Sequence, residues 1–184
     1  MDGDIKMHLE LIRDPSGTFP EIAEPDAVLS AKVWYCKYKS HLPLAQFRNM
    51  EELVIAGFPD ASFEFLGRLE KLRVLHVLHM PKISDIVPLA NLVHLKSVSL
   101  ATLPSWDASR KTTIIQSLEP LAAIPELAYL ELFGICPADK SLAPLERCRH
   151  LQTARISQYP KAEIDRFYSA AKISNEFNPK PSFS

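Results

Sequence analysis

The feature that most constrains the fold is a short apolar motif that recurs at nearly constant intervals along the chain. In its clearest copy, Leu72, Leu75 and Val77 follow the spacing L-x-x-L-x-L, and Met80 and Pro81 end the run. The residues equivalent to Leu75 are Leu9, Val33, Leu53, Leu75, Val98, Leu130 and Ala154, at intervals of 24, 20, 22, 23, 32 and 24 residues. A period of about 20–29 residues indicates a repeat protein, in which each unit stacks on its neighbours.

A second motif, built around proline, lies between successive copies of the first. It reads Leu42-Pro43-Leu44, Val87-Pro88-Leu89, Glu119-Pro120-Leu121 and Ala143-Pro144-Leu145. Proline favours corners and the first turn of a helix, so we expect the chain to reverse at these points. In each L-x-L pair the two apolar side chains share one face of a strand, and the residue between them faces the other way. One unit alone cannot bury its apolar face, whereas stacked units bury a common core.

The two linked motifs resemble the leucine-rich repeat, in the short and irregular form of bacterial proteins. The resemblance implies an α/β fold, a leucine-rich-repeat solenoid or horseshoe. It also implies a parallel concave β-sheet of about seven strands, an N-terminal β cap and a C-terminal helical cap. The family usually places asparagine where each strand ends. Here that exit position carries Phe58, Met80, Leu103, Ile135 and Tyr159. We therefore expect an apolar stack in place of an asparagine ladder.

The aligned units divide the chain into three parts. Residues 1–30 are expected to form the N-terminal cap, including a degenerate first repeat, because Met7, Leu9 and Leu11 alternate with polar residues. Residues 31–159 hold the leucine-rich repeats. The one interval of 32 residues indicates an inserted loop near residues 105–113, and insertions in repeat proteins often lie on the binding face.

Residues 160–184 are expected to form a C-terminal capping helix and a tail. Ile164, Phe167, Tyr168 and Ala171 have the spacing of the apolar face of a helix. The tail that follows has no periodicity, and we expect it to be mobile.

Composition narrows the possible partners. The formal net charge of −1 offers no electrostatic basis for binding nucleic acid or an anionic membrane. No apolar run is long enough to span a membrane, and no signal-type stretch follows the acidic start. Three scattered cysteines (Cys36, Cys136, Cys148) do not make a disulfide framework. We expect a cytoplasmic protein, monomeric when free and without a cofactor.

Alternation along the strands predicts which side chains line the open, concave side of the sheet. The predicted partner-binding residues there are Trp34, Val54, Val74, His76, Leu78, Tyr129, Glu131, Phe133 and Arg155. Trp106 is added from the inserted loop. Apolar and aromatic residues with a charged rim are typical of a protein interface. The alternative is that a cap or the tail covers this surface.

Catalytic and metal-binding interpretations have less support. His76 and His79 lie three residues apart and lack further ligands at a suitable spacing. Cys36 is predicted on the concave face, but a thiol nucleophile needs a base beside it. The sequence therefore predicts a non-catalytic protein-interaction module, such as an inhibitor or immunity protein of a toxin or enzyme. A substrate-recognition subunit of a larger assembly and a cysteine-dependent enzyme remain as alternatives.

Overall fold

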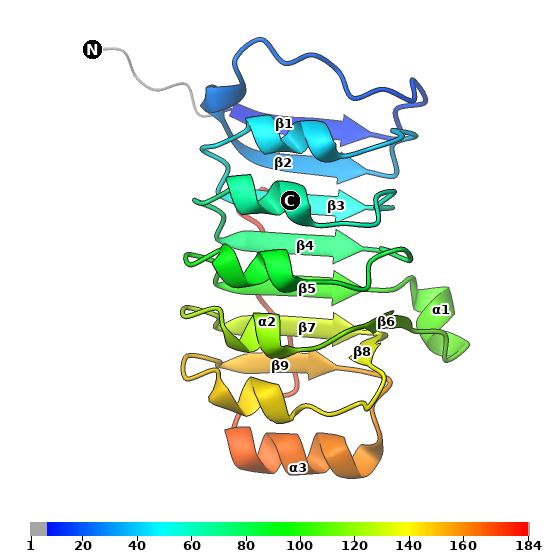
Figure 1. The fold of residues 1–184 in the computed structure, drawn as a ribbon, viewed down its shortest axis with the longest axis vertical. Helices are drawn as coiled ribbons and strands as arrows, with labels where there is room; N and C mark the ends of the chain where they lie inside the picture. The colour runs from blue at the N-terminus through cyan, green and yellow to red at the C-terminus, as the bar shows by residue number, and fades with distance from the viewer. Residues whose placement is uncertain (1–6, 184) are drawn as a thin grey trace.

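The recurring L-x-L pairs form the strands of one parallel sheet, as the computed structural model shows for residues 7–183 (Figure 1). The strands stack in chain order, β1-β2-β3-β4-β5-β7-β9. Their bounds are β1 Met7–Ile12, β2 Val28–Trp34, β3 Glu52–Ala56, β4 Val74–Leu78, β5 Ser97–Ala101, β7 Tyr129–Phe133 and β9 Thr153–Ile156. The first six residues of the predicted N-terminal cap, and Ser184, lie outside the described residues.

The core follows the two apolar positions of each strand. In the register of the sheet, Leu53, Leu75, Val98 and Leu130 lie side by side, and none of their surface is exposed. The second apolar position forms a parallel row that runs through Ile55, Val77, Leu100 and Leu132. Each unit therefore buries its apolar face against the units above and below it, which is the energetic basis of a solenoid.

The predicted alignment of the second repeat was wrong by two residues. Ala31, rather than Val33, pairs with both Leu9 and Leu53, so the first two intervals are each 22 residues. An alignment on Val33 makes Tyr35, two residues later, the second core residue of that repeat, but Tyr35 lies in the turn after β2 with a φ of 51°. Alanine gives a weak apolar signal, and a shift of two residues keeps every side chain on its face. The alternation could not reveal the error.

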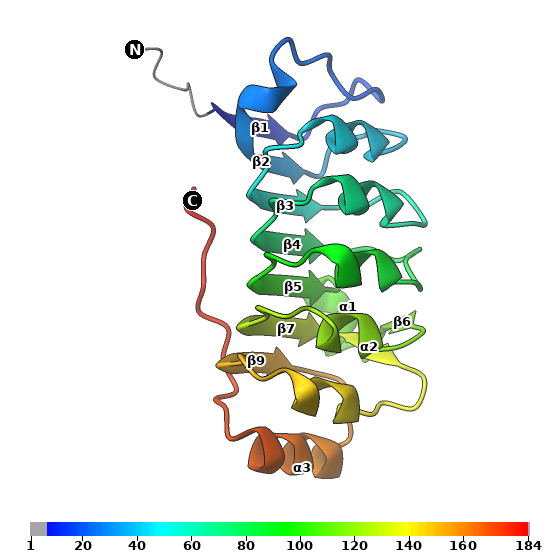
Figure 2. The ribbon, with the colours of Figure 1, turned by 60° about the vertical axis from the view of Figure 1, so that its left-hand side comes forward.

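Short helices bring the chain back along the other face of the sheet (Figure 2). They are η2 Leu42–Gln46, η3 Glu64–Arg68, η4 Val87–Asn91, α2 Glu119–Ala122 and η5 Ala143–Arg147. Four of the five carry proline in the first turn, where a missing amide hydrogen costs no helix bond. The residue before each helix points into the core. These residues are His41, Phe63, Ile86, Leu118 and Leu142, at most 1% exposed.

The remaining elements lie at the ends and at the insertion. A short helix η1 (Pro25–Ala27) precedes β2, and α3 (Lys161–Ala171) closes the far end of the stack with Phe167 fully buried. The insertion contains α1 (Pro104–Ala108), and β6 (Thr113–Ile115) then pairs with β8 (Ile135–Pro137) in a second, two-stranded sheet. Within residues 7–183, no helix is both long and apolar enough to cross a bilayer.

Candidate binding surface on the open face of the sheet

The face of the seven-stranded sheet opposite the short helices is here called the open face. Nine of the ten predicted binding residues come from positions on this face, in three rows across the strands. Val74 and Tyr129 belong to the row where strands enter, His76 and Glu131 to the middle row, and Leu78 to the exit row. Val54 and Arg155 extend the middle row, and Trp34 and Phe133 extend the exit row. The structure therefore places these nine side chains on one face of the sheet, as the alternation predicted.

The position of Trp34 within this face differs from the prediction. The sequence alignment put Trp34 in the middle row, but its partner in β3 is Ala56, so it stands in the exit row. Lys32 takes the middle position. The Lys32 ammonium lies 5.7 Å from the centre of the Trp34 ring and 3.3 Å from a Glu10 carboxylate oxygen. The corrected register therefore adds a cation beside the indole.

The centre of the open face is low because β5 carries small side chains. Ser97, Ser99 and Ala101 are 3%, 7% and 8% exposed. The His76 imidazole approaches the Ser97 hydroxyl at 3.3 Å, and the Ser99 hydroxyl donates to Glu131 at 2.7 Å. Ser99 and Ala101 line a cavity on this face together with Trp34, Leu78 and Glu131, and this hollow is here called the groove.

A charged and aromatic cluster stands beside this groove. Arg155 donates to Glu131 at 3.1 Å, and its guanidinium lies 4.7 Å from the centre of the Phe133 ring. The Glu131 side chain is 13% exposed and that of Arg155 is 52% exposed. Glu131 and Arg155 can pair because they occupy the same position on adjacent strands. The pairing with Glu131 already restricts the exposed Arg155 guanidinium, so less side-chain entropy would be lost when the guanidinium binds a partner.

Residues 173–183, here called the crossing segment, run over the open face from β9 toward β1 (Figure 2). The Ala154 amide donates to the Ser174 carbonyl, and the Ser182 amide donates to Glu52 at 2.7 Å. Phe177 lies 5.3 Å from the His76 ring, centre to centre. These contacts contradict the expectation of a mobile tail and bear out the alternative that the tail covers part of the surface.

The crossing segment contributes to the burial of His76 and so to its protonation state. Burial disfavours the charged imidazole and lowers the pKa of His76 to about 4. The ring is therefore neutral at pH 7 and offers a flat surface for stacking. No group of three histidine, cysteine or acidic side chains suited to a metal ion occurs within residues 7–183.

Cys36, considered from the sequence as a possible nucleophile on the concave face, does not lie on the open face. With the corrected register it occupies the strand-exit position equivalent to Phe58, and it is buried. Its thiol donates to the Leu11 carbonyl at 3.4 Å. β2 ends at Trp34, and Tyr35 has a positive φ, so the alternation that assigns faces along a strand does not extend to Cys36.

Trp106 is the predicted residue that the fold separates from the others. It lies in α1, beyond the exit edge of the strands (Figure 1). Its ring packs edge-on against His79, with centres 5.0 Å apart. The neighbouring Asp107 accepts hydrogen bonds from Ser157 and Gln158 at 2.7 and 2.9 Å. The insertion is therefore attached to the edge of the sheet.

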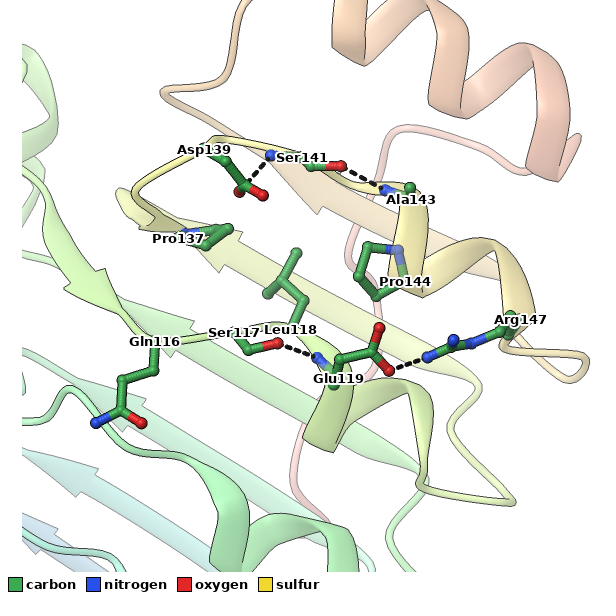
Figure 3. A pocket seen from close by; sticks show the side chains of 10 residues that line it. All are labelled: Gln116, Ser117, Leu118, Glu119, Pro137, Asp139, Ser141, Ala143, Pro144 and Arg147. Carbon is green, nitrogen blue, oxygen red and sulfur yellow. Dashed lines mark hydrogen bonds and ion pairs between the residues drawn. The ribbon is translucent and has the colours of Figure 1, made fainter.

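A separate pocket of about 330 Å³ lies between α2 and η5, away from the open face (Figure 3). Its polar groups are largely engaged with one another. Glu119 pairs with Arg147, and Asp139 accepts from the Ser141 amide, which is a turn contact. Ser141 in turn accepts from the Ala143 amide. The pocket therefore presents the ends of helices and turns, with few groups left for a ligand.

Two residues of the surface were missed by the sequence reasoning, Phe177 and Phe183. Phe183 lies 4.1 Å from the His8 ring, centre to centre, and lines a cavity with Trp34 and Val54. Both phenylalanines stand in an otherwise polar, proline-containing stretch. Aromatic residues in a polar stretch were the available signal.

The architecture defines a leucine-rich-repeat solenoid, and comparison with solved structures agrees. An internalin (inlF) of Listeria monocytogenes superposes with a TM-score of 0.55 at 17% identity, over 80% of this chain and 47% of its own. A leucine-rich-repeat protein of Leptospira interrogans gives 0.52 at 14%, over 80% and 42%. The chain thus spans less than half the length of either structure. No protein-family model and no curated protein matches the sequence.

Proposed function

We propose that this chain is a non-catalytic module that binds a protein partner through the open face of its sheet. The observation that carries the proposal is the cluster of half-buried aromatic residues around a paired arginine, namely Tyr129, Phe133 and Arg155. Aromatic residues and arginine are the usual anchors of protein interfaces. A guanidinium already held by Glu131 loses less freedom on binding.

Within that class, the role we favour is an inhibitor or immunity protein that occludes a toxin or enzyme. The three thiols are free, which fits the reducing, cytoplasmic compartment expected from composition. A substrate-recognition subunit is the second candidate, because the same face could hold a client without blocking it. The two differ in outcome. An inhibitor abolishes its partner's activity at one equivalent, whereas a recognition subunit leaves its client active.

The first experiment maps the surface that meets the partner. Benzoylphenylalanine at Tyr129 places a photoreactive group on the open face with little change in shape. The matched control places it at Val87 in η4, which is 56% exposed on the opposite side. Irradiation in the native cell should capture a protein at Tyr129 and none at Val87. Capture at Val87 alone would place the interface on the helical side.

The second experiment measures affinity for the captured protein. Phe133→Ala and Tyr129→Ala should each weaken binding by at least about 1 kcal/mol, which is about fivefold in Kd. Their melting temperatures should change little, because both side chains are only partly buried. Val87→Ala is the matched control. If both variants bind normally but melt much earlier, the rings are structural and the proposal fails.

A further inference from the structure

The crossing segment runs over the open face from β9 to β3 (Figure 2). It starts at the bridge between Ser174 and Thr153 in β9, and the Phe177 ring then lies against His76 in β4. The Ser182 amide donates to Glu52 in β3, and the Phe183 ring reaches from there to His8 in β1. The segment therefore lies across the strands.

Its side chains alternate like those of a strand. Phe177, Pro179, Pro181 and Phe183 are partly buried toward the sheet, whereas Asn178, Lys180 and Ser182 are exposed. An extended backbone turns every second side chain to the same side. The side chains of the crossing segment that face the sheet are thus apolar and lie at every second position, and the first and last of them are aromatic.

The crossing segment makes few hydrogen bonds to the sheet. Within residues 7–183, its hydrogen bonds to the sheet are those of the Ser174 carbonyl and the Ser182 amide. Pro179 and Pro181 have no amide hydrogen to donate. A cavity of about 370 Å³ remains under Pro181 and Phe183, lined by Trp34 and other groove residues. An occupant that fills this space would gain contacts that the segment does not make.

We infer that the crossing segment occupies the partner site in cis, and that the partner displaces it with an extended segment of the same chemistry. That segment has apolar side chains at every second residue and an aromatic residue at each end of a seven-residue stretch like Phe177 to Phe183. The inference rests on the proposed function, and it adds both the kind of partner and its competition with the chain itself.

The test uses the full chain and a fluorescent peptide of residues 173–183 as the probe. Phe177→Ala and Phe183→Ala are combined in the chain to loosen its own segment. The loosened chain should bind the peptide at least tenfold more tightly than the wild-type chain, measured by fluorescence anisotropy. Tenfold corresponds to a wild-type face that is occupied in about nine tenths of molecules. A peptide with the same two alanines should bind neither chain.

Two controls fix the meaning of each result. The first control is that the loosened chain must still unfold cooperatively on heating. The second is a chain with Asn178→Ala and Lys180→Ala, which change exposed positions of the crossing segment. This chain should bind the peptide with the wild-type affinity. Equal binding of the two peptides, or equal binding by the wild-type and loosened chains, overturns the inference. Partner capture at Tyr129 in that event leaves the proposed function standing. Loss of capture at Tyr129 removes the proposed function itself.

Discussion

A single histidine should make the fold unstable in mild acid. His41 precedes η2, and none of its surface is exposed. Phe63, Ile86, Leu118 and Leu142 hold the equivalent place in the other repeats. Neither ring nitrogen of His41 has a hydrogen-bond partner within residues 7–183. An imidazole therefore stands in a row of apolar side chains, where its polar atoms are desolvated without compensation.

The size of the effect follows from linkage. Burial lowers the pKa of His41 from 6.5 to about 4, although the carboxylate of Asp60 opposes the shift. The unfolded chain therefore binds more protons than the folded chain between these two values. Stability is full above pH 6.5 and falls as the pH drops toward 4. At pH 5 His41 alone should remove about 2 kcal/mol of the stability present at pH 7.

His41→Leu is the test, because leucine already fills this place in two other repeats. The backbone amide of residue 41 donates to Asp60 at 2.7 Å, and the substitution keeps that bond. The variant should gain about 1–3 kcal/mol at pH 7 by removing two unsatisfied nitrogens, and about 2 kcal/mol more at pH 5.

Urea unfolding of both proteins at pH 7 and pH 5 measures the two differences. The wild-type slope also includes other histidines, so the decisive quantity is the difference between wild type and variant. His94→Leu, at an exposed position, is the control for the loss of a surface histidine. If wild type and His41→Leu lose equal stability on acidification, His41 is not held neutral by the core, and the reasoning is refuted.

Three further outcomes are expected. Leu75→Asp should leave the chain unfolded at 25 °C by circular dichroism, because it buries a carboxylate in the middle of the shared core; a wild-type melt would end the core assignment. Gly134→Ala should cost at least about 2 kcal/mol in urea unfolding and more than Gly57→Ala. Both glycines have positive φ, but the new methyl at 134 would meet the Thr102 hydroxyl oxygen at 2.3 Å. The pKa of His76, about 4 in the wild-type chain, should rise in the chain loosened at both phenylalanines, and NMR titration would show an unchanged value if the crossing segment does not bury it.

The repeat architecture could be predicted because it depends on side chains that are easily recognised in the sequence. Leu53, Leu75 and Leu130 are large and apolar, they recur at similar intervals, and each one lies fully buried in the same row. Face assignment needs only the parity of the spacing. That is why the open face, including Tyr129 and Phe133, was identified from sequence even where one repeat was misaligned.

The crossing segment could not be predicted by the same reasoning. It has no repeat partner, it pairs with the sheet at one bridge near Ser174, and its polar residues face solvent. Its path depends on the surface that the strands of the seven-stranded sheet create together. The two phenylalanines indicated a need for burial, but only the assembled sheet shows that His76 and His8 provide the place.

The strand exits show most clearly how assembly overrides local preference. Arg13, Tyr35 and His79 adopt positive φ at equivalent places, as do Gly57 and Gly134. A residue with a β-carbon costs about 1–2 kcal/mol in that conformation, so sequence alone favours a register in which glycine recurs there. Yet the amides of Arg13, Tyr35, Gly57 and His79 donate in turn to Trp34, Ala56, Leu78 and Ala101 at 2.7–2.9 Å. This ladder continues the sheet past the end of each strand, so a bond from the neighbouring repeat supports the turns at Arg13, Tyr35 and His79, none of which is glycine. The repeats that end at Arg13 and His79 were aligned correctly although neither turn has glycine. The slip between Val33 and Ala31 therefore comes from the weak apolar signal of alanine at the first core position of β2, and not from the turn that follows it.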